Sequence, residues 1–442
     1  MTTERRLERD LPRILGDLAM GPYPDYIDDV LATTVHRRQR PAWTSLERWL
    51  PMVDITRQPV LAPRIPWRSI SFAILLIALL LAGAAVFIGS QSRLPAPFGV
   101  ARNGLIAYEV GGDIYTADPE AGVAALIVAG PEIDQGPRFS RDGTHFVFER
   151  KLGDPTGPGQ LYVARSDGSE LTRVTPEPIT LTKSLLGEPW QQYDFSPDGR
   201  TLLFASMTGD RADLWIAQSD GSGVRRLDVG MAVYEPSFRP PDGAEIMFVG
   251  PDVEGVRGSG IFAVDVASGD VRTVIPPLGG FYDLAGAVWS PDGSRIAYQR
   301  WGGAGAADGI SAHTRVVAAD GTADRALPAP PDAVWDASPQ WSNDGERLFI
   351  VRGYTSGFDV VRPVVIPADG SGTGIEIPYP GIINGECCAD WEWSPDDSWI
   401  LVQPTDAAGL PMQQVIVDPL MGTARPAPWT STSDPTVQRL AP

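Results

Sequence analysis

The chain has 442 residues, among them 47 glycines, 42 prolines and 13 tryptophans, and a formal net charge of −19. The composition predicts a turn-rich, aromatic-rich protein, and the length suits one large repeat domain with accessory segments. Because nucleic-acid binding needs a positively charged surface, the excess of acidic residues argues against a nucleic-acid partner.

Residues 1–66 predict a small α-helical head. Two stretches carry apolar residues at helical spacing, and Thr44-Ser-Leu-Glu47 is a capping box that predicts a third helix. So short a segment barely forms a core alone, and we expect a protein partner or a second copy to cover its apolar faces. One hypothesis is an anti-sigma-like head that holds a transcription factor, although residues 1–66 lack the cysteines of the zinc motif found in many such heads. The alternative is an amphipathic lead-in to the next segment.

Residues 69–91 predict one transmembrane helix. No charged residue occurs between Ser69 and Ser92, and the stretch from Ile70 to Ile88 is almost wholly apolar. At about 1.5 Å per residue this stretch reaches roughly 28 Å, close to the hydrocarbon thickness of a bilayer. A cleaved signal peptide would lie nearer the start of the chain and be shorter.

The distribution of arginines predicts the orientation of this helix. Arg57, Arg64 and Arg68 lie on its N-terminal side, whereas the other side is sparsely charged. Positive flanks stay in the cytoplasm. We therefore expect a single-pass protein of the cell membrane with a cytoplasmic N-terminus and an extracytoplasmic domain.

One short turn motif recurs along the rest of the chain at spacings of 43 to 56 residues. Its six copies are Phe139-Ser-Arg-Asp-Gly143, Phe195-Ser-Pro-Asp-Gly199, Phe238-Arg-Pro-Pro-Asp-Gly243, Trp289-Ser-Pro-Asp-Gly293, Trp341-Ser-Asn-Asp-Gly345 and Trp393-Ser-Pro-Asp-Asp397. Proline presets the first turn dihedral, aspartate binds nearby backbone amides, and glycine accepts a positive φ. Each copy therefore predicts a tight turn between an inner strand and the next one.

The strands around these turns predict an all-β, seven-bladed β-propeller over residues 102–442. An alternating apolar strand follows every turn, and a third strand, an Asp-Gly-type hairpin and a fourth strand complete the unit. Residues 103–122 supply strands two to four of a first blade that lacks its innermost strand. We expect residues 435–440 to supply that strand and close the ring, which removes exposed sheet edges.

The repeats at Phe195-Ser-Pro-Asp-Gly-Arg-Thr-Leu-Leu-Phe204 and Trp289-Ser-Pro-Asp-Gly-Ser-Arg-Ile-Ala-Tyr298 resemble the TolB-like, WD-related propeller repeat of extracytoplasmic bacterial proteins. The resemblance covers residues 102–442. It implies the fold but not one activity, because such propellers serve as protein-binding platforms in the TolB family and as gating domains in prolyl-oligopeptidase-like peptidases.

No familiar catalytic motif occurs in the sequence. The Gly-x-Ser-x-Gly elbow of a hydrolase domain is missing, and the three histidines, His36, His145 and His313, belong to distant segments. We therefore expect no enzyme activity, no cofactor and no metal site. The adjacent Cys387 and Cys388 suggest either a strained vicinal disulfide near the propeller mouth or two small, partly buried thiols.

These observations predict a non-enzymatic, membrane-anchored scaffold that binds an extracytoplasmic protein, peptide or glycan on one end of the propeller. The candidate contacts are aromatic residues shortly before the repeat aromatics, and packing between blades is the alternative role for each. They are Trp190, Tyr234, Tyr282, Trp335 and Trp391. The alternative functions are anti-sigma-like transmembrane signalling, with a cytoplasmic protein bound to the head, and an unrecognised hydrolase.

Overall fold

The structure is a computed structural model of the chain, whose contacts divide it into two units, residues 1–88 and 89–442. It describes residues 74–77, 98–182, 193–251, 258–277, 284–300, 313–354, 361–377, 391–402, 413–429 and 435–441. In the first unit only residues 74–77 are described; they are helical and exposed. No helix within the described ranges is long and apolar enough to cross a membrane. The predicted head lies outside these ranges.

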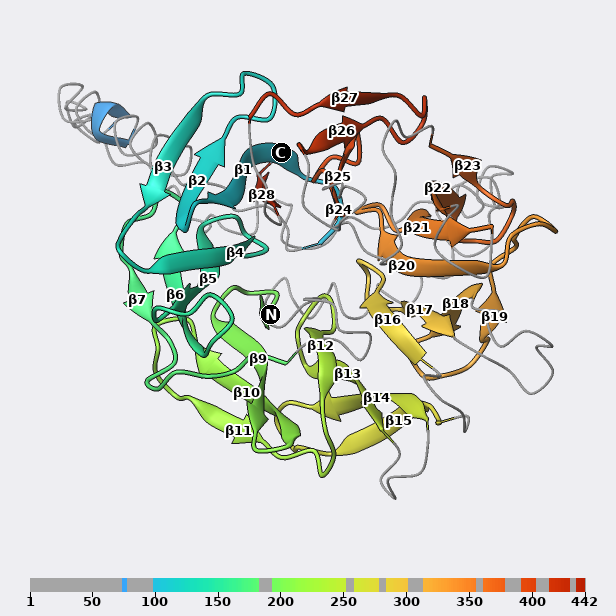
Figure 1. Ribbon diagram of the computed structural model, residues 1–442, viewed down its shortest axis with the longest axis horizontal. Helices are drawn as coiled ribbons and strands as arrows, with labels where there is room; N and C mark the ends of the chain where they lie inside the picture. The colour runs from blue at the N-terminus through green and yellow to red at the C-terminus, as the bar shows by residue number, and fades with distance from the viewer. Residues whose placement is uncertain are drawn as a thin grey trace, which may run out of the picture. The chain divides into compact units, whose positions relative to one another are not determined.

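The second unit is a ring of seven four-stranded antiparallel sheets, which confirms the predicted propeller (Figure 1). From its innermost strand outward, blade 1 contains β28 (Thr436–Leu440), β1 (Arg102–Val110), β2 (Asp113–Ala117) and β3 (Ala124–Val128). Blade 2 contains β4 (Ile133–Phe139), β5 (His145–Lys151), β6 (Gly159–Arg165) and β7 (Thr172–Arg173). Blade 3 contains β8 (Tyr193–Phe195), β9 (Thr201–Thr208), β10 (Arg211–Gln218) and β11 (Arg225–Leu227).

The remaining four blades repeat this order around the ring. Blade 4 contains β12 (Tyr234–Phe238), β13 (Glu245–Pro251), β14 (Ser259–Asp265) and β15 (Val271–Ile275). Blade 5 contains β16 (Leu284–Trp289), β17 (Arg295–Arg300), β18 (His313–Ala318) and β19 (Arg325–Ala326). Blade 6 contains β20 (Trp335–Trp341), β21 (Arg347–Gly353), β22 (Val361–Pro367) and β23 (Ile375–Glu376), and blade 7 contains β24 (Trp391–Trp393), β25 (Ile400–Val402), β26 (Val415–Val417) and β27 (Ala424–Pro426).

The last strand closes the ring as predicted. Strand β28 pairs antiparallel with β1, with Arg102 opposite Leu440 and Ala107 opposite Thr436. Blade 1 is therefore made from two ends of the repeat region, and β28 supplies the inner strand that the other blades take from consecutive parts of the chain.

The repeated turns owe their shape to hydrogen bonds within each copy. In blade 2 the Ser140 hydroxyl donates to Asp142 Oδ1 at 2.6 Å, and the Thr144 amide donates to the same oxygen at 3.0 Å. Gly143 has a φ of 67°, and a Cβ there would lie 2.0 Å from the Arg439 carbonyl oxygen. Glycine is thus required both by the turn and by the close approach of the neighbouring blade.

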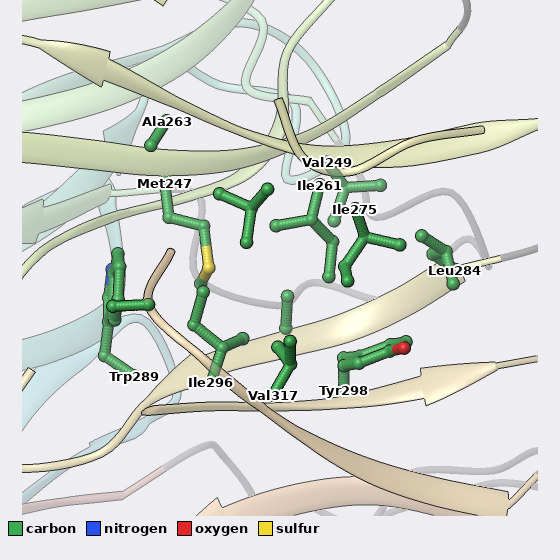
Figure 2. Close-up of a cluster of buried hydrophobic side chains, with 13 residues drawn as sticks. Met247, Val249, Ile261, Ala263, Ile275, Leu284, Trp289, Ile296, Tyr298 and Val317 are labelled. Atoms are coloured by element: carbon green, nitrogen blue, oxygen red, sulfur yellow. The ribbon is translucent and has the colours of Figure 1, made fainter. Parts of the chain in front are cut away.

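Apolar faces of adjacent blades pack together to form the core. Figure 2 shows one such layer, in which Met247 and Ile261 of blade 4 face Ile296 of blade 5. The repeat aromatics also join blades directly: Trp341 Nε1 donates to the Val288 carbonyl at 3.2 Å, and Trp393 Nε1 to that of Gln340 at 3.3 Å. In blades 6 and 7 the motif tryptophan therefore connects its own blade to the preceding one.

Candidate active site at the centre of the ring

A cavity of about 240 Å³ lies among the inner strands of the propeller. All seven inner strands, or the turns that follow them, contribute to its wall. Its charged lining residues are Arg138, Arg141, Asp194, Glu392 and Arg439, and its aromatic lining residues are Phe98, Phe238, Trp289, Trp341, Trp391 and Trp393. Although the protein is strongly acidic, the described wall thus carries three arginines against two carboxyl groups.

Glu392 is the carboxyl group best suited to proton transfer in this cavity. It is the middle residue of β24, between two buried tryptophans, and its side chain is half-buried. Burial raises the pKa of Glu392, while the charges of Arg138 and Arg141 and hydrogen bonds from the Val437 amide and the Thr436 hydroxyl act in the opposite direction. A carboxyl group with a raised pKa keeps its proton at higher pH and can donate it to a substrate.

The arginines make the same cavity suitable for an anion. Arg439, in the closing strand, is only 6% exposed, and burial together with the charge of Arg141 lowers its pKa to about 10. The Arg439 side chain therefore remains charged at neutral pH. The Arg141 guanidinium also lies over the Phe98 ring, 5.0 Å from its centroid.

Three buried hydrogen-bond donors on the wall complete the site. Ser237 Oγ, Trp289 Nε1 and Trp391 Nε1 have no hydrogen-bond partner among the described residues. A substrate with several oxygen atoms could satisfy them, since unpaired buried donors are costly.

The predicted contact residues do not gather in one place. Trp391 lines the cavity, and its ring lies 4.7 Å from that of Phe349. Trp335 is buried among the side chains between blades 6 and 7, and Tyr234 packs against the core between blades 4 and 5. Trp190, Tyr282, Cys387 and Cys388 lie outside the described residues. The role of all these residues in binding stays a prediction.

The described histidines belong to separate blades. His145 is in β5, where its Nδ1 lies 2.8 Å from the Thr144 hydroxyl. His313 begins β18, with Nδ1 3.4 Å from Asp336 Oδ2. Within the described part of the chain, no three His, Cys, Asp or Glu side chains gather as a metal site would require.

The sequence analysis did not select Glu392 or the three arginines of the cavity. One signal was present: Arg141 occupies a position that is proline in most copies of the turn, which marks a departure from the repeat. Glu392 and Arg439 gave no local signal, because their surroundings come from strands that are far apart in the sequence.

Comparisons with known proteins show the fold of this chain but not its family. No protein-family model matches the chain. The uncharacterized protein Atu1656 of Agrobacterium fabrum is 32% identical over 117 residues, which make up 24% of this chain and 39% of that protein.

Several solved structures have a similar fold at low sequence identity. The oligogalacturonate lyase of Vibrio parahaemolyticus has a TM-score of 0.51 at 13% identity, covering 74% of this chain and 86% of that one. TolB of Acinetobacter baumannii has a TM-score of 0.42 at 18% identity, covering 60% of this chain and 62% of its own. The chain has the fold of a seven-bladed β-propeller. A puromycin-hydrolyzing peptidase of Mycobacterium tuberculosis is also similar, with a TM-score of 0.48 at 15% identity, covering 76% of this chain and 56% of that one.

These likenesses contradict the expectation of a non-enzymatic scaffold. A solved structure of similar propeller fold is a lyase, so the fold does not argue against an enzyme. The prediction rested on the missing serine elbow and the scattered histidines. Acid–base chemistry at a carboxyl group needs neither, so their absence was a poor criterion.

Proposed function

We propose that the propeller is an enzyme that cleaves an anionic substrate by acid–base catalysis in its central cavity, with Glu392 as the proton donor. The observation that carries this proposal is a carboxyl group with a raised pKa on a cavity wall that also carries three arginines. Burial favours the protonated donor, and the arginines can bind the charge of the substrate.

The proposed reaction is hydrolysis of a carbon–oxygen bond. Glu392 gives its proton to the leaving oxygen as the bond breaks, and a water molecule supplies the hydroxyl group that bonds to the carbon. The second proton of that water goes to the carboxylate of Asp194, the other acidic residue on the described wall. Return of this proton to Glu392 through solvent restores the enzyme.

The substrate class that fits this wall best is an acidic carbohydrate. Its carboxylate can pair with the guanidinium groups, its hydroxyl groups can accept from Ser237, Trp289 and Trp391, and its ring faces can contact tryptophans. Oligogalacturonate, named for the lyase of similar fold, belongs to this class and is the first substrate to test.

The test is turnover of oligogalacturonate by the purified full chain in detergent. We expect product from the wild type, at least a hundredfold less from Glu392→Gln, and full activity in the control Glu346→Gln, whose residue is exposed outside the cavity. Product mass distinguishes hydrolysis, which adds water, from elimination, which leaves an unsaturated end. Undiminished activity in Glu392→Gln would refute the role of this residue.

We also propose that residues 69–91 anchor the enzyme in the cell membrane with the propeller outside. The absence of charged residues from this segment supports the proposal. The apolar side chains of the helical residues 74–77 also support it, because they are 49% to 62% exposed and a bilayer would cover them. Protease added to whole cells should digest the propeller, and protection until lysis would exclude this topology.

A cytoplasmic partner for residues 1–66 stays a prediction, which a pull-down with the head would test.

A further inference from the structure

The repeated turn departs from its own pattern at the wall of the cavity. Its third residue is proline in blades 3, 4, 5 and 7, but Arg141 in blade 2 and Asn343 in blade 6. Both of these residues line the cavity. In blade 7 the closing glycine is replaced by Asp397, which has a φ of 59° and is 7% exposed. A non-glycine residue in this conformation is strained, so the turn alone does not explain why aspartate stands here in place of glycine.

Two of these departures bind each other across blades 6 and 7. Asp397 Oδ1 accepts the Asn343 amide at 2.7 Å and the Asn343 side-chain Nδ2 at 2.9 Å, and Asp397 Oδ2 accepts the Asp344 amide at 2.8 Å. The Asn343 Nδ2 also donates to the Ser394 carbonyl at 2.9 Å. With both Nδ2 hydrogens engaged, the side-chain oxygen of Asn343 points away from blade 7.

That oxygen accepts a hydrogen bond from the arginine of the closing strand. Arg439 Nη1 donates to Asn343 Oδ1 at 2.6 Å, and Nη2 donates to the Gly99 carbonyl. Asp397 also attracts the Arg439 charge and raises its pKa in part, against burial and the nearby Arg141. The hydrogen-bonded series Asp397–Asn343–Arg439 thus holds the buried Arg439 guanidinium on the same cavity wall as Arg141.

The charge of Arg141 acts against that of Arg439, and Asp397 and Glu392 offset part of this repulsion. A substrate carboxylate between the two guanidinium groups would offset it further. Proline and glycine, which other copies of the turn have at these positions, could not make these contacts. Asn343 and Asp397 therefore join blades 6 and 7 and, through Asn343, also hold Arg439 at the cavity wall.

We propose that Arg439 and Arg141 form the subsite for the substrate carboxylate, and that Asn343 and Asp397 are positioning residues for Arg439. This inference rests on the proposed function for the identity of the substrate, but the subsite itself is defined by anion binding. Asn343 and Asp397 act through Arg439, because their hydrogen bonds set where its charge lies.

The test restores the repeat pattern with Asn343→Pro and Asp397→Gly in the full-length protein in detergent. Calorimetry would measure binding of galacturonate, with inorganic sulfate as a second anion and glucose as a neutral control. We expect each variant to bind galacturonate about ten- to a hundredfold more weakly than the wild type, while glucose binding is unchanged. Pro197→Asn, at the same turn position in blade 3 but not on the cavity wall, is the matched control and should bind like the wild type.

Folding of the variants is measured separately from binding. Asn343→Pro and Asp397→Gly both remove hydrogen bonds between blade 6 and the buried Asp397 carboxylate, so the urea midpoint should fall in both, and calorimetry is carried out where both variants are fully folded. In an Arg439→Gln background neither change should weaken galacturonate binding further. Unchanged galacturonate affinity in both variants would overturn the inference, as would a wild type that binds neither anion. Anion binding without turnover would instead leave the subsite standing and remove the proposed reaction.

Discussion

Glu235 makes the stability of the ring depend on pH near neutrality. It lies at the bulge of β12 with a φ of 52°, and its carboxylate Oε2 accepts the Gly286 amide of blade 5 at 2.8 Å. Burial raises the pKa of Glu235 from 4.5 to about 7, although hydrogen bonds from the Gly286 and Ala287 amides act against this. The native protein therefore holds a proton that the unfolded chain releases.

The sign of the effect follows from this difference in bound protons. Between pH 4.5 and about 7 only the native state carries the proton, so the free energy of unfolding falls as pH rises. The difference between the two pKa values corresponds to about 3 kcal/mol. Glu235→Gln keeps the shape of the protonated carboxyl group and has no charge to lose.

As pH rises from 4.5 to 8, the wild type should lose about 3 kcal/mol of stability that Glu235→Gln keeps. The advantage of the variant should therefore grow by this amount over the range. Urea unfolding of the full chain in detergent, followed by tryptophan fluorescence at a series of pH values, measures this gain. The exposed control Glu346→Gln should follow the wild type at every pH. A difference between variant and wild type that is the same at all pH values would refute the reasoning.

Two further predictions concern the stability of blades 4 and 6. Arg272 and Arg239 lower the pKa of Glu245 to about 2. The ionised Glu245 therefore adds about 2 kcal/mol, after allowance for exposure, to the free energy of unfolding above pH 4.5, and this is lost as pH falls towards 2. Glu245→Gln should remove this contribution, which urea midpoints measured at a series of acid pH values would show. A Cβ at Gly353 would lie 2.0 Å from Cε2 of the buried Trp335, so Gly353→Ala should cost about 1–3 kcal/mol, and an unchanged thermal midpoint would contradict this packing.

The fold was predictable because its determinants are local and repeated. Ser290, Asp292 and Gly293, for example, form a turn whose hydrogen bonds all lie within a few residues, and six copies gave the blade spacing. Ring closure by β28 could be predicted because one blade lacked an inner strand. The structural role of the motif serine was not anticipated, although it binds the turn aspartate in the same way as Ser140 in blade 2.

The site could not be predicted in the same way because its contacts join distant residues. Arg439 and Asn343 are 96 positions apart in sequence and meet only after the ring closes. The raised pKa of Glu392 depends on burial in the closed ring, beside Thr436 and Val437 of β28. The candidate contact residues were chosen because they are aromatic and precede the turn motif. These criteria could not distinguish Trp335, which packs between blades, from Trp391, which reaches the cavity wall.

The pairing of β28 with β1 also orders events during synthesis. Blades 2 to 7 use strands that are consecutive in the chain, whereas blade 1 must wait for the strand that emerges last. Until residue 440 has left the ribosome, the nascent protein is an open arc in which β1 lacks its partner β28. Because that final strand also carries Arg439, a product that stops early lacks the ring closure and the cation together, so no shortened chain can present a finished binding site.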